Sequence, residues 1–95
     1  MNTLIDNRLF EWDDDKAAIN FKKHGVTFDT AAKVFGDENR IEEYDEEHSI
    51  DEDRWQVIGM VGKVIFVIYT ERGDFIRLIS AREATPMERR KYYVG

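Results

Sequence analysis

Residues 77–91 read RLISAREATPMERRK, an apolar strand pattern that runs directly into the start of a helix. Thr85 and Glu88 stand three residues apart, as a capping box requires. Pro86 occupies the first helical position, where a missing backbone N–H group costs nothing. The stretch therefore predicts a strand that continues to Ala81 and a C-terminal helix that begins at Pro86. Because its Arg and Lys side chains are crowded together, it is also the first place to look for a phosphate-binding surface.

The size and composition of the chain favour one small globular domain. Its 95 residues suffice for a single hydrophobic core, so we expect residues 1–95 to form one domain. The absence of Cys excludes disulfides and thiolate metal sites, and 36% charged residues beside 42% hydrophobic residues are typical of a soluble protein. The longest apolar run, Val64–Tyr69, is far shorter than the roughly 20 residues of a membrane span. No targeting segment is visible, and we expect a cytoplasmic protein that enters no membrane.

Charge is distributed unevenly along the chain. The net charge is −6, but residues 1–60 hold 16 acidic and 7 basic residues, whereas residues 61–95 hold 4 acidic and 7 basic residues. An acidic body suits a basic protein partner, while a basic segment suits phosphate groups. One small domain with this charge pattern is therefore suited to both kinds of partner.

Local signals predict two helices before the strands. An acidic start near Asp14 and a cationic last turn before Gly25 predict the first helix. Thr27 can cap a second helix that Gly36 closes. The apolar side chains of this second helix recur with helical spacing and form one stripe: Phe28, Ala31, Ala32 and Phe35. Such a stripe needs a sheet to cover.

Four segments rich in Val, Ile and aromatic residues predict that sheet: 40–44, 55–61, 63–70 and 75–81. Gly62 and the polar Glu71–Asp74 connection indicate tight turns between neighbouring strands. Residues 42–53 contain eight acids among twelve residues, which favours a solvated loop. We therefore expect an α+β fold with two N-terminal helices, a four-stranded antiparallel sheet and a C-terminal helix.

Arg77 and Arg82 are the leading candidates for phosphate contacts, because the guanidinium group offers a fixed fork of donors. In a strand that is regular through Ala81, Arg77 shares a face with Ala81, and Ser80 lies on the other face. The direction of Arg82 stays open at the strand exit. The structural alternative for both arginines is an ordinary surface ion pair.

The two histidines receive different interpretations. His24 is a candidate general acid or base, with a helix-capping role as the alternative. His48, amid carboxylates, is interpreted as a solvated loop residue. The acidic loop lacks the spacing of a metal site, so we expect neither a metal nor a cofactor. The tyrosines Tyr69, Tyr92 and Tyr93 can stack on RNA bases but more often close a small core.

Several ordered blocks of the sequence resemble the BrnT family, the toxin half of a bacterial type II toxin–antitoxin pair. The blocks are Phe10-Glu11-Trp12-Asp13 with Lys16 and Asn20, Lys23-His24-Gly25-Val26-Thr27-Phe28, Ala31-Ala32-x-Val34-Phe35, Arg54-Trp55-x-x-Ile58-Gly59, and Arg77-x-Ile79-Ser80-Ala81-Arg82-x-Ala84-Thr85-x-x-Glu88-Arg89. Because they cover nearly the whole chain in order, they are more specific together than any one block.

The resemblance implies a RelE-like fold and an endoribonuclease that uses no metal or organic cofactor and inhibits translation. In such enzymes the ribose 2′-hydroxyl attacks the adjacent phosphate and leaves a 2′,3′-cyclic phosphate. Carried onto matching positions, the resemblance makes His24, Arg77 and Arg82 the catalytic candidates. The weaker candidates, for RNA contacts, are Lys23, Lys63, Tyr69, Ser80 and Arg89.

The resemblance also implies protein and nucleic-acid partners. The expected partner is a BrnA-like antitoxin with a ribbon-helix-helix part, in a hetero-oligomer such as a heterotetramer that represses its own operon. Operator DNA is then contacted only through the antitoxin, and RNA is the substrate, free or on the ribosome. The acidic body motivates an alternative, a catalytically inactive module that binds the antitoxin and tunes repression.

Overall fold

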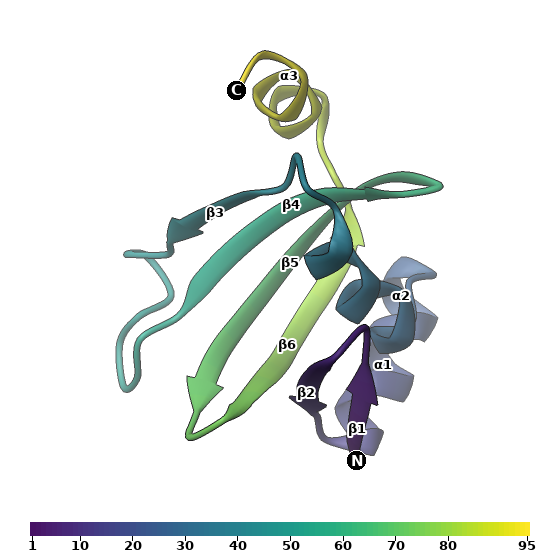
Figure 1. Ribbon diagram of the computed structural model, residues 1–95, viewed down its shortest axis with the longest axis vertical. Helices are drawn as coiled ribbons and strands as arrows, with labels where there is room; N and C mark the ends of the chain where they lie inside the picture. Colours follow the sequence, from purple (N-terminus) through teal and green to yellow (C-terminus); the bar gives the residue numbers. More distant parts are fainter.

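A six-stranded sheet in the order β1-β2-β6-β5-β4-β3 forms the centre of the computed structural model, which describes residues 1–95 (Figure 1). The strands are β1 (Asn2–Ile5), β2 (Arg8–Glu11), β3 (Ile41–Tyr44), β4 (Trp55–Val61), β5 (Lys63–Arg72) and β6 (Phe75–Glu83). Strands β3 to β6 pair with one another in antiparallel fashion. These four strands confirm the predicted antiparallel segments, with small differences at their ends.

The prediction of a four-stranded, wholly antiparallel sheet is wrong at one edge. β1 and β2 form an additional hairpin, and β2 runs parallel to β6, with Phe10 opposite Ile76. The hairpin turn places Asp6 and Asn7 at φ 51° and 65°. These two residue types tolerate the left-handed region better than other non-glycine residues. The sheet is therefore mixed, and the fold class is α+β with three α-helices.

The three helices begin where the sequence predicts, the first ends before Gly25 as expected, and the second changes to a 3₁₀ turn before it reaches Gly36. They are α1 (Asp14–His24), α2 (Phe28–Lys33), which continues into the 3₁₀ turn η1 (Val34–Gly36), and α3 (Pro86–Val94). Asp13 caps α1, Thr27 caps α2, and Thr85 with Glu88 forms the complete capping box of α3. Gly25 ends α1 at φ 71°, a conformation that favours glycine. None of these helices is long and apolar enough to cross a membrane.

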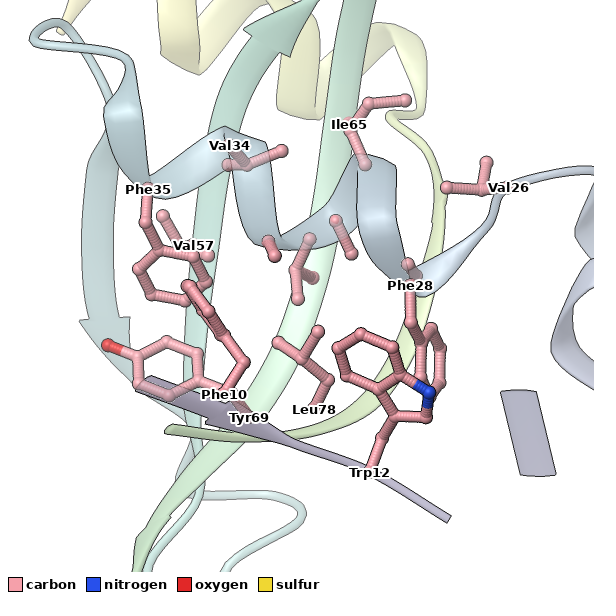
Figure 2. Close-up of a cluster of buried hydrophobic side chains, with 14 residues drawn as sticks. Phe10, Trp12, Val26, Phe28, Val34, Phe35, Val57, Ile65, Tyr69 and Leu78 are labelled. Atoms are coloured by element: carbon pink, nitrogen blue, oxygen red, sulfur yellow. The ribbon is translucent and has the colours of Figure 1, made fainter. Parts of the chain in front are cut away.

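The main hydrophobic core lies between the sheet and the segment formed by α2 and η1 (Figure 2). Phe35 packs its ring against Phe10 at 5.4 Å and Tyr69 at 5.0 Å between ring centroids, while Trp12 meets Phe28 at 5.9 Å. We call this side of the sheet the α2 face. The predicted apolar stripe of the second helix is confirmed, because Phe28, Ala31, Ala32 and Phe35 are all buried here.

The opposite side, which we call the α3 face, is covered only in part. A smaller cluster of Ile58, Val64, Phe66 and Ala84 lies there, with Tyr92 of α3 packed against it. Figure 1 shows α3 at one end of the sheet, above the connection that leads from η1 to β3, where Tyr92 bonds to Asp37. The rest of the α3 face is left without a covering helix.

A bulge in β6 decides which side chains reach the α3 face. Ile68 pairs with Ser80 and Tyr69 with Leu78, so Ile79 is an extra residue in β6. The alternation of side chains shifts at a bulge, and Leu78 and Ala81 consequently both enter the core on the α2 face. The prediction of a regular strand, with Arg77 on the face of Ala81 and Ser80 opposite, is therefore wrong. Arg77, Ser80 and Arg82 all belong to the α3 face.

Candidate functional site

A groove of about 330 Å³ opens on the uncovered part of the α3 face. Gln56, Ile68 and Ser80 are neighbours in register on β4, β5 and β6, and they form its floor. The remaining lining residues are His24, Glu47, His48, Phe66, Arg82 and Glu88. We call this the sheet groove. It brings together three residues that the sequence predicts for the site, namely His24, Ser80 and Arg82.

Arg82 is held from two sides in the groove. Its guanidinium lies 4.2 Å from the centre of the Phe66 ring, a cation–π contact. Its two terminal nitrogens donate to both carboxylate oxygens of Glu88 at 2.7 and 3.0 Å. The direction of Arg82, left open by the sequence, is thus into the groove, but its charge is paired with Glu88.

Glu88 connects this arginine to the start of α3. Its carboxylate also accepts the backbone N–H of Thr85 at 2.9 Å. Burial works to raise the pKa of Glu88, but the hydrogen bonds from Arg82 and Thr85 outweigh it and hold the pKa below the usual value. The capping box therefore has a second role here, because it fixes the carboxylate that orients Arg82.

His24 reaches the groove because α1 is fastened to the free edge of β6. The buried Asn20 amide donates to the carbonyls of Val26 at 3.0 Å and Ala81 at 2.9 Å, and its oxygen accepts the N–H of Ala81 at 3.1 Å. β2 pairs with β6 only as far as Arg77. Beyond that point the Asn20 amide replaces a neighbouring strand as the hydrogen-bond partner of the β6 backbone at Ala81. Fixing Asn20 in this way places the last turn of α1 beside Ser80.

A second hollow of about 230 Å³ adjoins the sheet groove on the side of α1. It shares His24 and Ser80 with the groove and adds the cationic side chains of Lys16 and Lys23. Lys23, a predicted RNA contact, is therefore next to the groove and not within it. The two hollows form one continuous surface around His24 and Ser80.

His48 is the functional candidate that sequence reasoning missed. Its interpretation as a loop residue open to solvent agrees with its exposed position in a turn, but the ring also lines the sheet groove and its Nδ1 lies 2.8 Å from Oδ2 of Asp45. Asp45 is 2% exposed and also accepts the backbone N–H of His48 at 3.2 Å. The available signal was the Asp-x-x-His spacing, which lets one carboxylate hold both the turn and the imidazole.

The other predicted site residues do not line the groove. Arg77 lies on the same face but pairs with Glu11 of β2 at 3.2 Å. Lys63 pairs with Glu83 at 3.6 Å, and Arg89 donates to the carbonyl of Ala84 at 3.3 Å.

Tyr69 is 6% exposed and belongs to the core on the α2 face. Burial, followed by its hydrogen bond to Glu42, raises the pKa of Tyr69 well above its ordinary value. This tyrosine therefore has a structural environment. No three His, Asp or Glu side chains are grouped as metal ligands would be.

Comparison with known proteins places this architecture in a family. Residues 12–88 match the family model of the ribonuclease toxin BrnT of type II toxin–antitoxin systems. The structure is similar to the 1.1 Å crystal structure of the Brucella abortus ribonuclease toxin BrnT, with a TM-score of 0.61 and 26% sequence identity over 80% of this chain and 95% of that chain. No match was found among curated proteins. Because the family model spans every element from α1 to the start of α3, the chain belongs to the BrnT family of ribonuclease toxins.

Proposed function

We propose that this protein is a metal-independent endoribonuclease that cleaves RNA in the sheet groove, inhibits translation and is neutralised by a BrnA-like antitoxin. The observation that carries the proposal is the convergence of His24, Ser80 and Arg82, from α1 and β6, on one uncovered groove. A proton-transfer group, a hydroxyl donor and a cation are the groups that phosphate transesterification needs. Family membership supports the same activity.

The chemistry assigns each residue a separate task. The ribose 2′-oxygen forms a bond to phosphorus, and the bond from phosphorus to the 5′-oxygen breaks, which leaves a 2′,3′-cyclic phosphate and a 5′-hydroxyl. Arg82 stabilises the extra negative charge on phosphorus oxygens in the transition state. Ser80 donates a hydrogen bond to a phosphate oxygen, and His24 transfers a proton.

Cleavage by purified protein tests the proposal directly. The protein is incubated with RNA, both free and on translating ribosomes, and the new RNA ends are mapped. We expect cyclic phosphate ends from the unchanged protein and strongly reduced cleavage with Arg82→Ala. Arg90→Ala is the matched control, because Arg90 is an exposed arginine on α3 that does not line the groove. Arg77→Ala shows whether the second arginine of β6 contributes.

Intact RNA under both conditions, from protein that remains folded, contradicts the enzymatic function. Growth of cells that express the chain with and without its genomic neighbour then provides the biological readout. We expect arrest without the neighbour and normal growth with it. If the neighbouring reading frame does not encode a basic ribbon-helix-helix protein, the proposed antitoxin partner is wrong.

A catalytically inactive module is the second candidate, and the pairing of Arg82 with Glu88 favours it. An arginine whose fork is filled by a carboxylate offers less charge to a phosphate. In this case the half of the chain with excess negative charge, residues 1–60, binds the basic antitoxin. The two proteins then form a heterotetramer that contacts operator DNA through the antitoxin alone. The two candidates differ in one measurement, since only the enzyme generates new RNA ends.

A further inference from the structure

The Asp45–His48 pair has the geometry of a group that transfers protons. Asp45 is almost completely buried, and its carboxylate holds Nδ1 of His48 at 2.8 Å. A carboxylate at Nδ1 selects the tautomer in which Nδ1 carries the proton and Nε2 presents a lone pair. No protein group forms a hydrogen bond with Nε2 of His48, and the side chain is 48% exposed.

The loop around the pair holds it in place. Ser49 Oγ donates to the carbonyl of Asp45 at 2.5 Å and accepts the N–H of Arg54 at 2.8 Å. The backbone N–H of Asp45 also bonds to the carbonyl of Arg54. These bonds close the β3–β4 connection into a fixed turn, so the position of the imidazole is set before any ligand arrives.

The two histidines lie on opposite sides of the groove floor. His48 belongs to the connection between β3 and β4, beside Gln56, whereas His24 belongs to α1, beside Ser80. Gln56 and Ser80 are separated by Ile68 on the strand between them. Two strand spacings amount to about 10 Å. The groove floor from Gln56 to Ser80 is therefore wide enough for one ribose and its phosphate.

We propose that His48, oriented by Asp45, is the general base of this site and that His24 is the general acid. The inference rests on the proposed function and assigns its two proton transfers. Nε2 of His48 takes the proton of the 2′-hydroxyl as the 2′-oxygen bonds to phosphorus. The bond to the 5′-oxygen breaks, and that oxygen takes a proton from the imidazolium of His24. Asp45 is a positioning residue that stabilises the imidazolium formed on His48.

Charged groups from every surrounding element face His48. Asp45 and Glu47 lie on its own loop, while His24 of α1, Arg82 of β6 and Glu88 of α3 line the same groove. A pH profile therefore has to be compared with variants. We expect the acid limb of kcat/KM in the unchanged protein to disappear in His48→Ala, because protonated His48 cannot accept the 2′ proton.

A substrate with an activated leaving group separates the base from the acid. RNA oligonucleotides and the four nucleoside 3′-(4-nitrophenyl phosphates) are cleaved by the unchanged protein, His48→Ala and His24→Ala. A nitrophenolate leaves without a proton, so only the base is needed. We expect both variants to lose about 10²–10⁴-fold in kcat on RNA. On the aryl esters we expect His24→Ala to recover to within about tenfold, while His48→Ala keeps its full loss.

Asp45→Asn tests the positioning role with little change of shape. Its amide oxygen can still accept the N–H of His48, but its NH₂ group faces Nδ1 and forces the proton onto Nε2. We expect lower kcat with KM nearly unchanged on both substrates. Glu46→Gln is the matched control, since it makes the same chemical change at an exposed position of the same loop. If His48→Ala does not fold, His48→Gln carries the same expectation.

The outcomes distinguish this inference from the function on which it rests. If His48→Ala cleaves RNA within about tenfold of the unchanged protein while Arg82→Ala is inactive, the assignment of His48 is overturned and the ribonuclease function stands. If the aryl ester restores His48→Ala and not His24→Ala, the two roles are reversed and the inference is wrong. If the folded, unchanged protein cleaves neither RNA nor the esters, both proposals fail.

Discussion

At the scale of single residues, the Arg82–Glu88 pair decides how much positive charge the groove offers. Arg82 is the cation that lines it, and Glu88 fills the guanidinium fork. The carboxylate is at the same time part of the α3 capping box. The pair stabilises the fold by a contact that a bound phosphate must share or replace.

Glu88→Gln is expected to strengthen RNA binding. The amide oxygen still accepts the Thr85 N–H, but the loss of charge weakens the hold on Arg82. An ion pair at a partly exposed position is worth up to about 1 kcal/mol, so we expect the dissociation constant for RNA to fall by at most about fivefold. Binding to a non-cleavable 2′-deoxy oligonucleotide, measured by fluorescence anisotropy, checks this.

Thr85→Ala is the control for that measurement. It removes the capping hydroxyl and costs about 1 kcal/mol of stability, but it leaves the charges of Arg82 and Glu88 unchanged. We expect its RNA affinity to equal that of the unchanged protein. Equal affinity in Glu88→Gln as well shows that Glu88 does not restrain Arg82.

The two histidines show what the sequence predicts at this scale. His24 is the last residue of a helix with clear caps, so its place could be predicted relative to Gly25. His48 lies in a segment whose charge density indicates a solvated loop, and the burial of one carboxylate within it depends on how that loop folds back, with the Asp45 backbone bonded to Ser49 and Arg54. Composition alone cannot distinguish Asp45 from its exposed neighbours.

At the scale of elements, local signals predicted the helices and the four antiparallel strands, because caps and apolar patterns are encoded nearby in sequence. The β1–β2 hairpin was missed because each of its short strands carries only one Ile or aromatic side chain. Its turn uses Asp6 and Asn7 where glycine is the stronger signal. The parallel pairing of β2 with β6 joins segments that are far apart in the chain, so no local signal predicts it. The bulge in β6 is visible only once the pairing of β6 with β5 is known.

Gly59→Ala is expected to loosen η1 from β4. A Cβ atom at this position would lie 2.7 Å from Cγ1 of Val34 and 3.1 Å from its carbonyl oxygen. Val34 is fully buried, so it has little room to move, and overpacking of this kind costs about 1–3 kcal/mol. Urea unfolding at equilibrium measures the loss.

The double variant Val34→Ala/Gly59→Ala provides the control. It removes the closest clash but keeps the close carbonyl, so we expect part of the Gly59→Ala loss to be recovered relative to Val34→Ala alone. If the losses of unfolding free energy from the two substitutions simply add, the clash with the Val34 side chain is not what destabilises Gly59→Ala.

At the scale of the whole molecule, stability is expected to depend on pH through the contact between Asp37 and Tyr92. Asp37 accepts the Tyr92 hydroxyl at 2.5 Å and the Met60 N–H at 2.7 Å. Burial works to raise the pKa of Asp37, but these hydrogen bonds outweigh it and hold the pKa below 3.8. Its stabilising contribution is present above that pH and is lost as the pH falls through the lower, folded pKa.

Tyr92 gives the opposite dependence. Its hydrogen bond to Asp37, followed by burial, raises the pKa of Tyr92 from 10.0 to about 12. Its contribution is complete below pH 10 and is lost as the pH rises toward 12. We expect Tyr92→Phe to be less stable than the unchanged protein at pH 7, by a difference that shrinks above pH 10. Unfolding free energies across this range check it, and a constant difference contradicts it.

The net charge of −6 is expected to give RNA cleavage an unusual salt dependence. Basic nucleic-acid-binding proteins lose affinity steeply as salt rises. Here the acidic body repels RNA over a distance that falls to about 10 Å at 0.1 M salt, while the groove acts at contact. We expect kcat/KM for free RNA to stay flat or to rise as salt increases from about 20 to 150 mM. Association with a basic partner should slow over the same range.

Replacing Glu46 and Asp51 by Lys separates this long-range effect from the groove. Both side chains are exposed and neither lines the groove. If repulsion by the acidic body limits the encounter, the double variant should cleave RNA faster than the unchanged protein at low salt, and the two should converge at high salt. A steep fall of cleavage with salt in the unchanged protein instead means that local cations at the groove outweigh the acidic body, so that net charge does not govern the approach of RNA.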